Sequence, residues 1–289
     1  MVGTRKADAP PSLRRRIKAN RELPAQVVRS IRDGRRHRKL FDEVETYCMF
    51  IGYPRSGHSL VGSIIDAHPE AVIAHELDAL RLLRIGFRRN QVWARILQHD
   101  AEFVANGSQA RIDYTYAIPG QWQGRWTKLR VIGDKKGAMS TRAIRAHPEL
   151  LDRVRTTMKV PLRVVHVTRN PFDNISTIAS RAKRTLAEAA DIYFELCETV
   201  ADTRKRLDAE ELLDVQHEQV ILDPQATIRR LVQHVGLEAA DDYVDACAST
   251  LFRAPRRTRE NAPWTPELVD ATTARLAPYD FLASYRYDE

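Results

Sequence analysis

Cysteine is scarce in this chain of 289 residues, which has three: Cys48, Cys197 and Cys247. They lie far apart, show no CxxC spacing and occur in apolar surroundings, so buried thiols are expected rather than a disulfide scaffold. The sequence also lacks a run of about 18 apolar residues and an apolar secretory signal at its start. These absences predict a cytoplasmic protein.

Aromatic residues are missing before position 41, where the positive charge is concentrated. Residues 1–40 hold 13 Lys or Arg and three acids, a net charge of +10, so the rest carries −2 of the total of +8. Such a segment attracts an anionic surface or an acidic partner, or forms a solvated, partly helical extension. Without base-stacking aromatics it does not predict specific binding of nucleic acid. We predict a basic extension at 1–40 and one domain at 41–289.

Two kinds of motif that point to metal chemistry are also absent. Neither His68 with His75 nor His217 with His234 has the spacing of a zinc site. The G-x-x-x-x-G-K-[ST] pattern of P-loop kinases is missing, and no clear Mg²⁺-binding Asp follows an apolar run. The sequence therefore predicts a reaction that requires no metal.

A strand, a loop and a helix are predicted where the apolar residues 47–51 run into YPRSGHSLVGSIIDAHP at 53–69. Gly52 to Gly57 supply turn chemistry, and apolar residues recur at helical spacing over 60–65 until Pro69 ends the helix. In such a unit the N–H groups of the loop converge with the positive end of the helix dipole. This geometry favours a bound phosphate or sulfate.

Four predicted strands end in polar or charged sequence: PRSGHS at 54–59, HELD at 75–78, GDKK at 133–136 and TRNPFD at 168–173. Helices alternate with these strands, which predicts an α/β fold with a parallel sheet and helices on both faces. Ligands in such sheets bind at the carboxyl ends of the strands. Residues 77–127 are predicted to form a helical and irregular insertion that builds the acceptor pocket, with Trp93 and Tyr116 among its candidate lining residues.

These motifs resemble those of the sulfotransferases that use 3′-phosphoadenosine 5′-phosphosulfate (PAPS), over residues 46–264. The loop at 53–60 is similar to the family's 5′-phosphosulfate loop, and VVHVTRNPFDNISTIASR at 164–181 is similar to its 3′-phosphate site. That site pairs an Arg with a Ser or Thr eight residues later, here Arg169 and Thr177, with Ser176 as the neighbouring candidate. RRTRENAPW at 256–264 resembles the basic loop that closes on the nucleotide, which adds Arg257 and Arg259.

The resemblance implies a P-loop-like sulfotransferase fold with PAPS as the sulfonate donor. It also implies that the 5′-phosphosulfate is held by Arg55, Ser56, Gly57, His58 and Ser59. The loop Arg and a Glu after DAHP look most like the tyrosylprotein sulfotransferase pattern, in which both are catalytic; here that Glu is Glu76. GDKK resembles the segment near the reacting sulfonate, and this places Lys135 in the site. His58 departs from the usual Thr, and His75 replaces an acid.

The chemistry of sulfonate transfer explains these residue types. An acceptor hydroxyl attacks sulfur in line, a carboxylate takes its proton, and cations stabilise the charge on the leaving phosphate oxygen. Arg55 suits that oxygen because its guanidinium is always charged. Glu76 is the expected base, with Asp78 and His75 as alternatives. Because side chains alternate along a strand, only one of Lys135 and Lys136 is expected to face the site, and we expect Lys135.

The acceptor is predicted to be a hydroxyl of a small molecule, carbohydrate or lipid. Two other functions remain as alternatives: a P-loop-type nucleotide-dependent kinase, and a non-catalytic nucleic-acid-binding protein that uses the basic segment. Like a sulfotransferase, both would have to bind an anion. The missing P-loop pattern argues against the kinase, and the missing aromatic residues argue against the nucleic-acid-binding protein.

Overall fold

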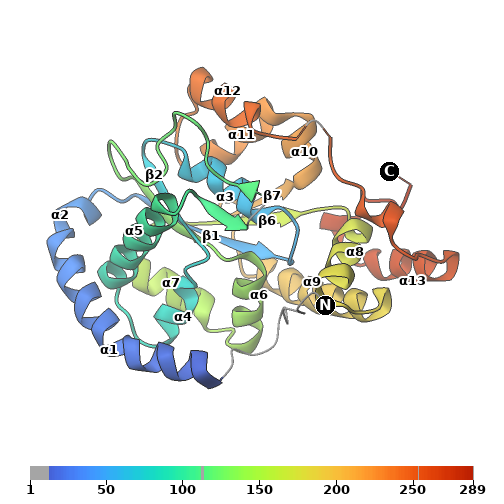
Figure 1. Cartoon of the computed structure of the whole chain (residues 1–289), viewed down its shortest axis with the longest axis horizontal. Helices are drawn as coiled ribbons and strands as arrows, with labels where there is room; N and C mark the ends of the chain where they lie inside the picture. Colours follow the sequence, from blue (N-terminus) through green and yellow to red (C-terminus); the bar gives the residue numbers. More distant parts are fainter. Residues whose placement is uncertain (1–12, 112–113, 253, 289) are drawn as a thin grey trace, which may run out of the picture.

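The computed structural model describes residues 13–111, 114–252 and 254–288. At its centre lies a parallel sheet with the strand order β2-β5-β1-β6-β7 (Figure 1). Its members are β1 (Thr46–Gly52), β2 (Ala71–His75), β5 (Val131–Lys135), β6 (Leu162–Thr168) and β7 (Leu212–Gln216). All neighbouring pairs run parallel, so every strand ends at the same edge of the sheet.

The central strand shows why the sheet is covered on both sides. All seven residues of β1 are buried, with Tyr47, Met49 and Ile51 in one apolar cluster and Cys48 and Phe50 in another. Successive side chains of a strand point to opposite faces, so the two clusters are the two layers of core above and below the sheet. The predicted fold class, a parallel sheet between helical layers, is confirmed.

Helices from much of the chain cover the first face. They are α1 (Leu13–Arg36), α2 (Arg38–Phe41), α4 (Ala79–Arg84), α5 (Arg89–Ala105), α6 (Gly137–Ala146), α7 (Leu150–Met158), α8 (Pro171–Ala182), α9 (Leu186–Arg204) and α13 (Pro266–Leu276). The second face is covered by α3 (His58–Asp66), α10 (His217–Leu222), α11 (Pro224–His234) and α12 (Asp241–Ser249). Two short 3₁₀ helices, η1 (Thr258–Asn261) and η2 (Asp280–Leu282), flank α13.

The segment predicted as an insertion holds α4, α5 and a small hairpin of β3 (Gln109–Arg111) and β4 (Tyr114–Thr115). Gly86, between α4 and α5, has φ +95°. Trp93 is fully buried against Phe41, so it belongs to the core and does not line a pocket.

The basic helix α1 does not stand apart from the rest of the chain. Leu23 and Val27 pack on the first core layer, and Gly34 lies so close to α5 that an added Cβ would be 2.9 Å from the carbonyl oxygen of Asn90. The division into an extension at 1–40 and a domain at 41–289 stays a prediction. Across the described residues, no helix combines the length and apolar character needed to cross a bilayer; the location of the protein also stays a prediction.

Candidate functional site

The loop between β1 and α3 forms the floor of the site. Arg55 and Gly57 both have left-handed backbone, with φ of 70° and 97°, and Gly57 caps α3. Within the described part of the chain, no acceptor binds the N–H groups of Ser56, Gly57, His58 and Ser59. A row of unpaired donors at a helix N-terminus favours the binding of an anion, as predicted for this loop. A Cβ at position 57 would collide with the ring of His217, so only glycine fits there.

The side chain of His58 points into the protein, away from this row of donors. Its Nε2 lies 3.0 Å from the carbonyl oxygen of Ile51, and its Nδ1 lies 3.1 Å from the hydroxyl of Ser56. Burial lowers the pKa of His58 to about 3, so the ring is neutral. Where the related loops carry Thr, this loop thus has a neutral imidazole that braces β1, and any contact of His58 with an anion is through its backbone N–H.

Lys135, at the end of β5, connects the loop to the neighbouring strand. Its ammonium group donates to the hydroxyl of Ser59 at 2.9 Å and to Glu76 Oε1 at 3.1 Å. His75 Nε2 lies 3.5 Å from the same nitrogen. The Lys135 side chain is 2% exposed, whereas that of Glu76 is 54% exposed. Burial lowers the pKa of Lys135, and the carboxylate of Glu76 opposes that shift.

Glu76 therefore lies at the mouth of the site as an ionised group. Partial burial alone would raise its pKa, but the charges of Lys135 and Lys136 outweigh that effect and lower the pKa to about 2. His75, beside it, stacks on Phe103 with ring centroids 4.3 Å apart. Burial and the charge of Lys135 lower the pKa of His75 to about 3, which keeps this imidazole neutral as well.

Lys136 also reaches Glu76, contrary to the expectation from strand alternation. Its Nζ lies 3.6 Å from Glu76 Oε2 and 3.3 Å from the Glu76 carbonyl oxygen. The expectation was wrong because β5 ends at Lys135: Lys136 has φ −120° and ψ 0°, so the chain has already left the extended conformation.

Asp134 holds the turn that carries Glu76. Its two buried carboxylate oxygens accept the N–H groups of Leu77 at 3.0 Å and Ala79 at 2.7 Å. Asp78, an alternative base, caps α4 by accepting the N–H of Arg81. That cap turns the Asp78 carboxylate toward the helix, which favours Glu76 over Asp78 as the group that meets an acceptor.

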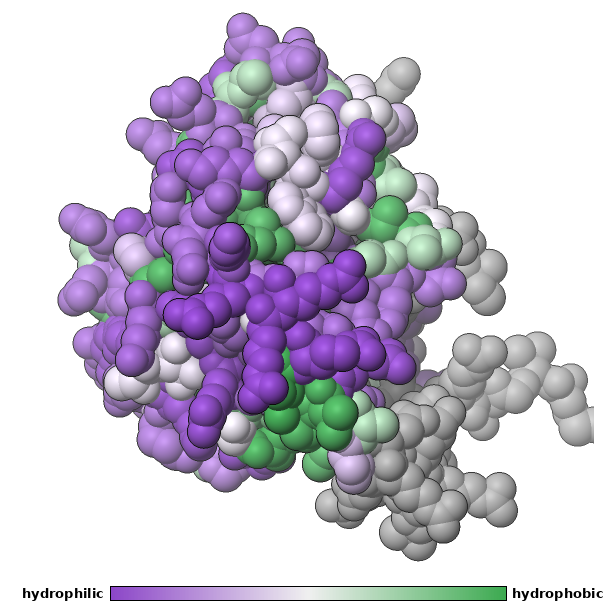
Figure 2. Space-filling model, turned by 90° about the vertical axis from the view of Figure 1, so that its left-hand side faces the viewer, coloured by the Kyte–Doolittle hydropathy of each residue, from purple (hydrophilic) through white to green (hydrophobic). Residues whose placement is uncertain are grey.

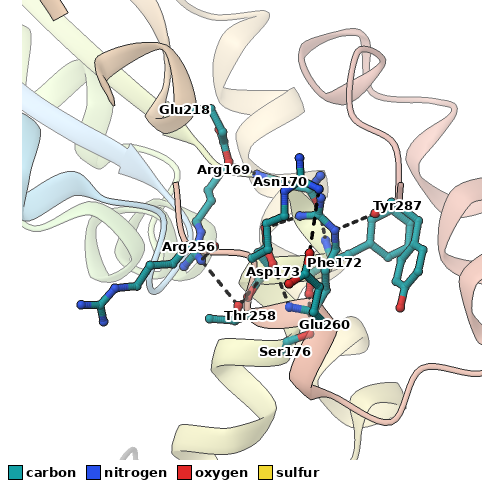
Figure 3. A network of polar contacts seen from close by, with 12 residues as sticks. Arg169, Asn170, Phe172, Asp173, Ser176, Glu218, Arg256, Thr258, Glu260 and Tyr287 are labelled. Carbon is teal, nitrogen blue, oxygen red and sulfur yellow. Dashed lines mark hydrogen bonds and ion pairs between the residues drawn. The ribbon is translucent and has the colours of Figure 1, made fainter. Parts of the chain in front are cut away.

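A second cluster lies where β6 passes into α8 (Figure 3). The guanidinium of Arg169 lies 3.5 Å from the hydroxyl of Thr177, the partner that the family resemblance implies for it. It also donates to the carbonyl oxygens of Arg256, at 2.6 Å, and Arg55, at 3.5 Å. Thr258, which the sequence analysis missed, has its hydroxyl 3.1 Å from that of Thr177 and 3.5 Å from Arg169.

Three other predicted nucleotide contacts occupy different surroundings. Ser176 accepts the indole N–H of Trp264 at 2.8 Å and donates to the carbonyl oxygen of Phe172, so it faces the core. Arg259 is buried in an ion pair with Asp173 and also binds the carbonyl oxygen of Tyr287 at 2.6 Å. Arg257 is half exposed and lies 3.8 Å from Glu260. Arg169 and Thr177 thus lie together, whereas the side chains of Ser176 and Arg259 are engaged in buried contacts with other residues.

Comparison with known proteins decides the family of the chain. The model of the Sulfotransferase family matches residues 49–242, which is more than half of the sequence. The chain belongs to the sulfotransferase family. The predicted family and enzyme class are confirmed, and the match favours sulfonate transfer over the two alternative functions.

Solved structures agree with this sulfotransferase on the fold. It is similar to the sulfotransferase STF9 from Mycobacterium avium, with 11% identity, a TM-score of 0.54, and coverage of 90% of this chain and 82% of that one. It is also similar to a sulfotransferase domain from the curacin biosynthetic pathway, with 11% identity, a TM-score of 0.53, and coverage of 84% of this chain and 99% of that one. A third similar structure is STF1 from Mycobacterium tuberculosis H37Rv, with 16% identity, a TM-score of 0.50, and coverage of 86% of this chain and 81% of that one. No curated protein matches the sequence.

Two buried carboxyl groups lie beneath the site of this sulfotransferase. A cavity of about 10 Å³, room for about one water molecule, is lined by Gly62, Ser63, Asp66, Ile73, His75, Phe103, Gln123 and Lys135. Asp66 accepts the N–H of Ile73 at 2.7 Å and lies within hydrogen-bond reach of Asp100. Burial raises the pKa of Asp66, and burial raises the pKa of Asp100 to about 7. The pair therefore holds a proton at neutral pH.

We found no group of three or more His, Cys, Asp or Glu arranged for a metal ion among the residues that the structure describes. The predicted independence of metal stays a prediction.

The Asp66–Asp100 pair predicts how stability depends on pH. Because the folded-state pKa of Asp100 is raised to about 7, the unfolded chain loses its proton first, and stability falls as pH rises from about 4 to 7. Asp100→Asn removes this cost while an amide N–H still bonds to Asp66. We expect the melting temperature of this variant to exceed that of the parent by several degrees at pH 8 and by much less at pH 4.

Calorimetric melting at both pH values tests this, with Asp202→Asn as the control, since Asp202 is an exposed residue on α9. An equal change at the two pH values in Asp100→Asn would contradict the shared proton.

Proposed function

We propose that this sulfotransferase moves the sulfonate group of PAPS to an acceptor hydroxyl by in-line displacement. The observation that carries the proposal is the position of Lys135, which bonds at once to Ser59 in the anion-binding loop and to Glu76 at the next strand end. In-line transfer aligns the attacking and leaving oxygens, and a cation between them can stabilise the charge that develops during transfer. One buried ammonium group would supply that cation.

Residues 55–59 would hold the 5′-phosphosulfate. The unpaired N–H groups of residues 56–59 donate to its oxygens, and the guanidinium of Arg55 stabilises charge on the oxygen that leaves sulfur. Ser59 contributes a hydroxyl already in contact with Lys135. The side chains of Ser56 and His58 would not touch the phosphosulfate but would hold the loop in place, because they bond to each other and to carbonyl oxygens of β1 and the loop.

Glu76 would accept the proton of the acceptor hydroxyl. Its carboxylate is exposed enough to meet an acceptor and is ionised at neutral pH. A carboxylate with a pKa of about 2 is a weak base, but its basicity rises as Lys135 and Lys136 engage sulfonate oxygens and leave it less strongly paired. His75 remains the alternative, because its neutral imidazole touches the same ammonium group.

The cluster around Arg169 would hold the 3′-phosphate. A guanidinium and two hydroxyls, those of Thr177 and Thr258, lie within 3.5 Å of one another. Both hydroxyls donate to the carbonyl oxygen of Asp173, and a hydroxyl rotates readily to a stronger acceptor. Burial favours the pairing of Arg169 with an anion, because a buried cation is stabilised by a partner charge.

The acceptor would approach along the wall formed by α5 and the hairpin. His75 stacks on Phe103, and Tyr116 lies 5.4 Å from the His75 ring. Flat rings of this kind pack well against the face of a sugar or an aromatic alcohol. A small molecule, a carbohydrate or a lipid with a free hydroxyl fits this wall.

Arg169→Ala should weaken the binding of 3′-phosphoadenosine 5′-phosphate by about 1.5–3 kcal/mol, the usual effect of a lost charge-assisted hydrogen bond. Adenosine 5′-phosphate lacks the 3′-phosphate and should bind to parent and variant alike. Titration calorimetry with both nucleotides checks this. Equal losses for the two ligands would mean that Arg169 supports the loop and does not bind the 3′-phosphate.

Glu76→Gln should lower turnover by about 10²–10⁴-fold, because the amide cannot accept the proton. It should leave nucleotide affinity unchanged, because glutamine has nearly the same size as glutamate. Asp78→Asn is the matched control, because Asp78 lies two residues away and caps a helix; it should keep near-parental turnover. Single-turnover transfer at saturating PAPS is the measurement, with His75→Gln alongside. Parental rates for Glu76→Gln with a large loss for His75→Gln would assign the base to His75.

Arg55→Ala should lower turnover and weaken nucleotide binding together, because the same guanidinium meets the phosphate before and during transfer. Arg55→Lys should retain more activity, since the point charge remains although the rigid fork of donors is lost. The same single-turnover assay, combined with calorimetry, separates the two effects. A fully active Arg55→Ala would contradict the role of this loop.

A further inference from the structure

The described arginines of α1 and α2 gather at one end of the molecule, away from the candidate site. The basic face, as we define it, consists of Arg29, Arg32, Arg35 and Arg36 of α1, Arg38 and Lys39 of α2, and Arg88 and Arg89 at the start of α5. Because α2 comes directly before β1, this face lies near the amino end of that strand, whereas the candidate site lies at the carboxyl ends. A partner can therefore bind here without covering the site.

The charge of the basic face is largely uncompensated. Its eight cations are accompanied by three acids, Asp33, Asp42 and Glu43, which leaves a net charge of +5. Among the described residues, only Arg32 of these cations forms an ion pair, with Asp33 at 3.0 Å. Figure 2 looks onto this end and shows strongly hydrophilic residues in a band beside an apolar patch. Repulsion within such a cluster is relieved by a partner of opposite charge.

The outer side of α1 adds an apolar component. Leu23, Val27, Ser30 and Gly34 face the protein, so residues on the opposite side of the helix face solvent. Val28 is 67% exposed on that outer side and lies next to a row formed by Arg29, Arg32 and Arg36 at helical spacing. Ile31, at the border of the packed side, is 38% exposed. Exposed aliphatic side chains beside a row of arginines are typical of a helix that lies in the interface of an anionic membrane.

Nucleic acid is a less suitable partner for this surface. Sequence-tolerant binding of single strands depends on exposed aromatic rings on which bases stack. Phe41, Phe87 and Trp93, which neighbour the basic face in the sequence, are all buried, and Phe41 and Trp93 pack on each other with centroids 5.5 Å apart.

We propose that the basic face docks this enzyme on the surface of an anionic lipid membrane, with Val28 and Ile31 entering the headgroup region. Docking in this way keeps the carboxyl edge of the sheet free for nucleotide and acceptor. The proposal is independent of the residue roles given above, because no residue of the basic face belongs to the candidate site.

Sedimentation of the full chain with lipid vesicles tests the proposal. The protein should bind vesicles of phosphatidylcholine containing phosphatidylglycerol at low salt, bind pure phosphatidylcholine far less, and be released by high salt. Equal binding to both vesicle types, or binding to neither, would overturn it. A tighter complex with polyuridylate than with the anionic vesicles would show that the face binds nucleic acid instead.

Two variants assign the binding to the basic face. Arg32→Glu with Arg36→Glu should lower vesicle affinity by more than tenfold, since each arginine near an anionic surface contributes roughly a factor of five. Lys183→Glu with Lys205→Glu makes the same change of charge on exposed residues at the ends of α8 and α9, and it should bind like the parent. Equal losses in the two double variants would mean that net charge alone drives binding.

Val28→Gln with Ile31→Gln keeps the charge and removes the apolar contribution. Vesicle affinity should fall several-fold, because aliphatic side chains gain free energy only where they leave water. An unchanged affinity would contradict insertion into the headgroup region. Nucleotide binding by calorimetry, which should equal that of the parent in all three double variants, confirms that each one is folded.

Discussion

The buried ammonium group of Lys135 is the constraint on which the candidate site depends. A charge this deeply buried is strongly destabilising unless its donors find acceptors, and Ser59 and Glu76 provide them. Gly62 makes room for the side chain, since a Cβ there would lie 2.7 Å from Lys135 Cγ. The two hydrogen bonds of this one ammonium group thus fix the separation between the loop that precedes α3 and the Glu76 carboxylate that follows β2.

A second buried charge organises the other half of the site. Asp173 pairs with Arg259 and accepts the N–H of that residue at 2.8 Å, so η1 is held against the start of α8. That contact brings Thr258 beside Thr177 and sets the carbonyl oxygen of Arg256 against Arg169. Arg169 in turn reaches the carbonyl oxygen of Arg55, which joins this half to the loop. The buried cations Lys135 and Arg259 therefore hold the two clusters of the candidate site in one frame.

The parts of this frame that depend on local pattern could be predicted from the sequence. Arg169 and Thr177 lie eight residues apart on one turn and helix, and the loop before α3 has its own signature, so the sequence could name both as candidates; their roles stay predictions. Thr258 was missed because it meets Thr177 across 81 residues, and nothing in RRTRENAPW distinguishes its hydroxyl from any other. Lys136 was misjudged because alternation holds only within a strand, and the end of β5 cannot be read to a single residue.

Three charged residues at the mouth of the site hold left-handed backbone: Arg55 at φ 70°, Glu76 at 66° and Asp78 at 70°. Each such residue costs about 1–3 kcal/mol, which glycine would avoid. Half of the six described non-glycine residues with such a backbone therefore lie at the mouth of the candidate site and are charged. Selection for thermal stability alone would drive these positions toward glycine, so directed evolution for a more robust enzyme should keep them under an activity screen.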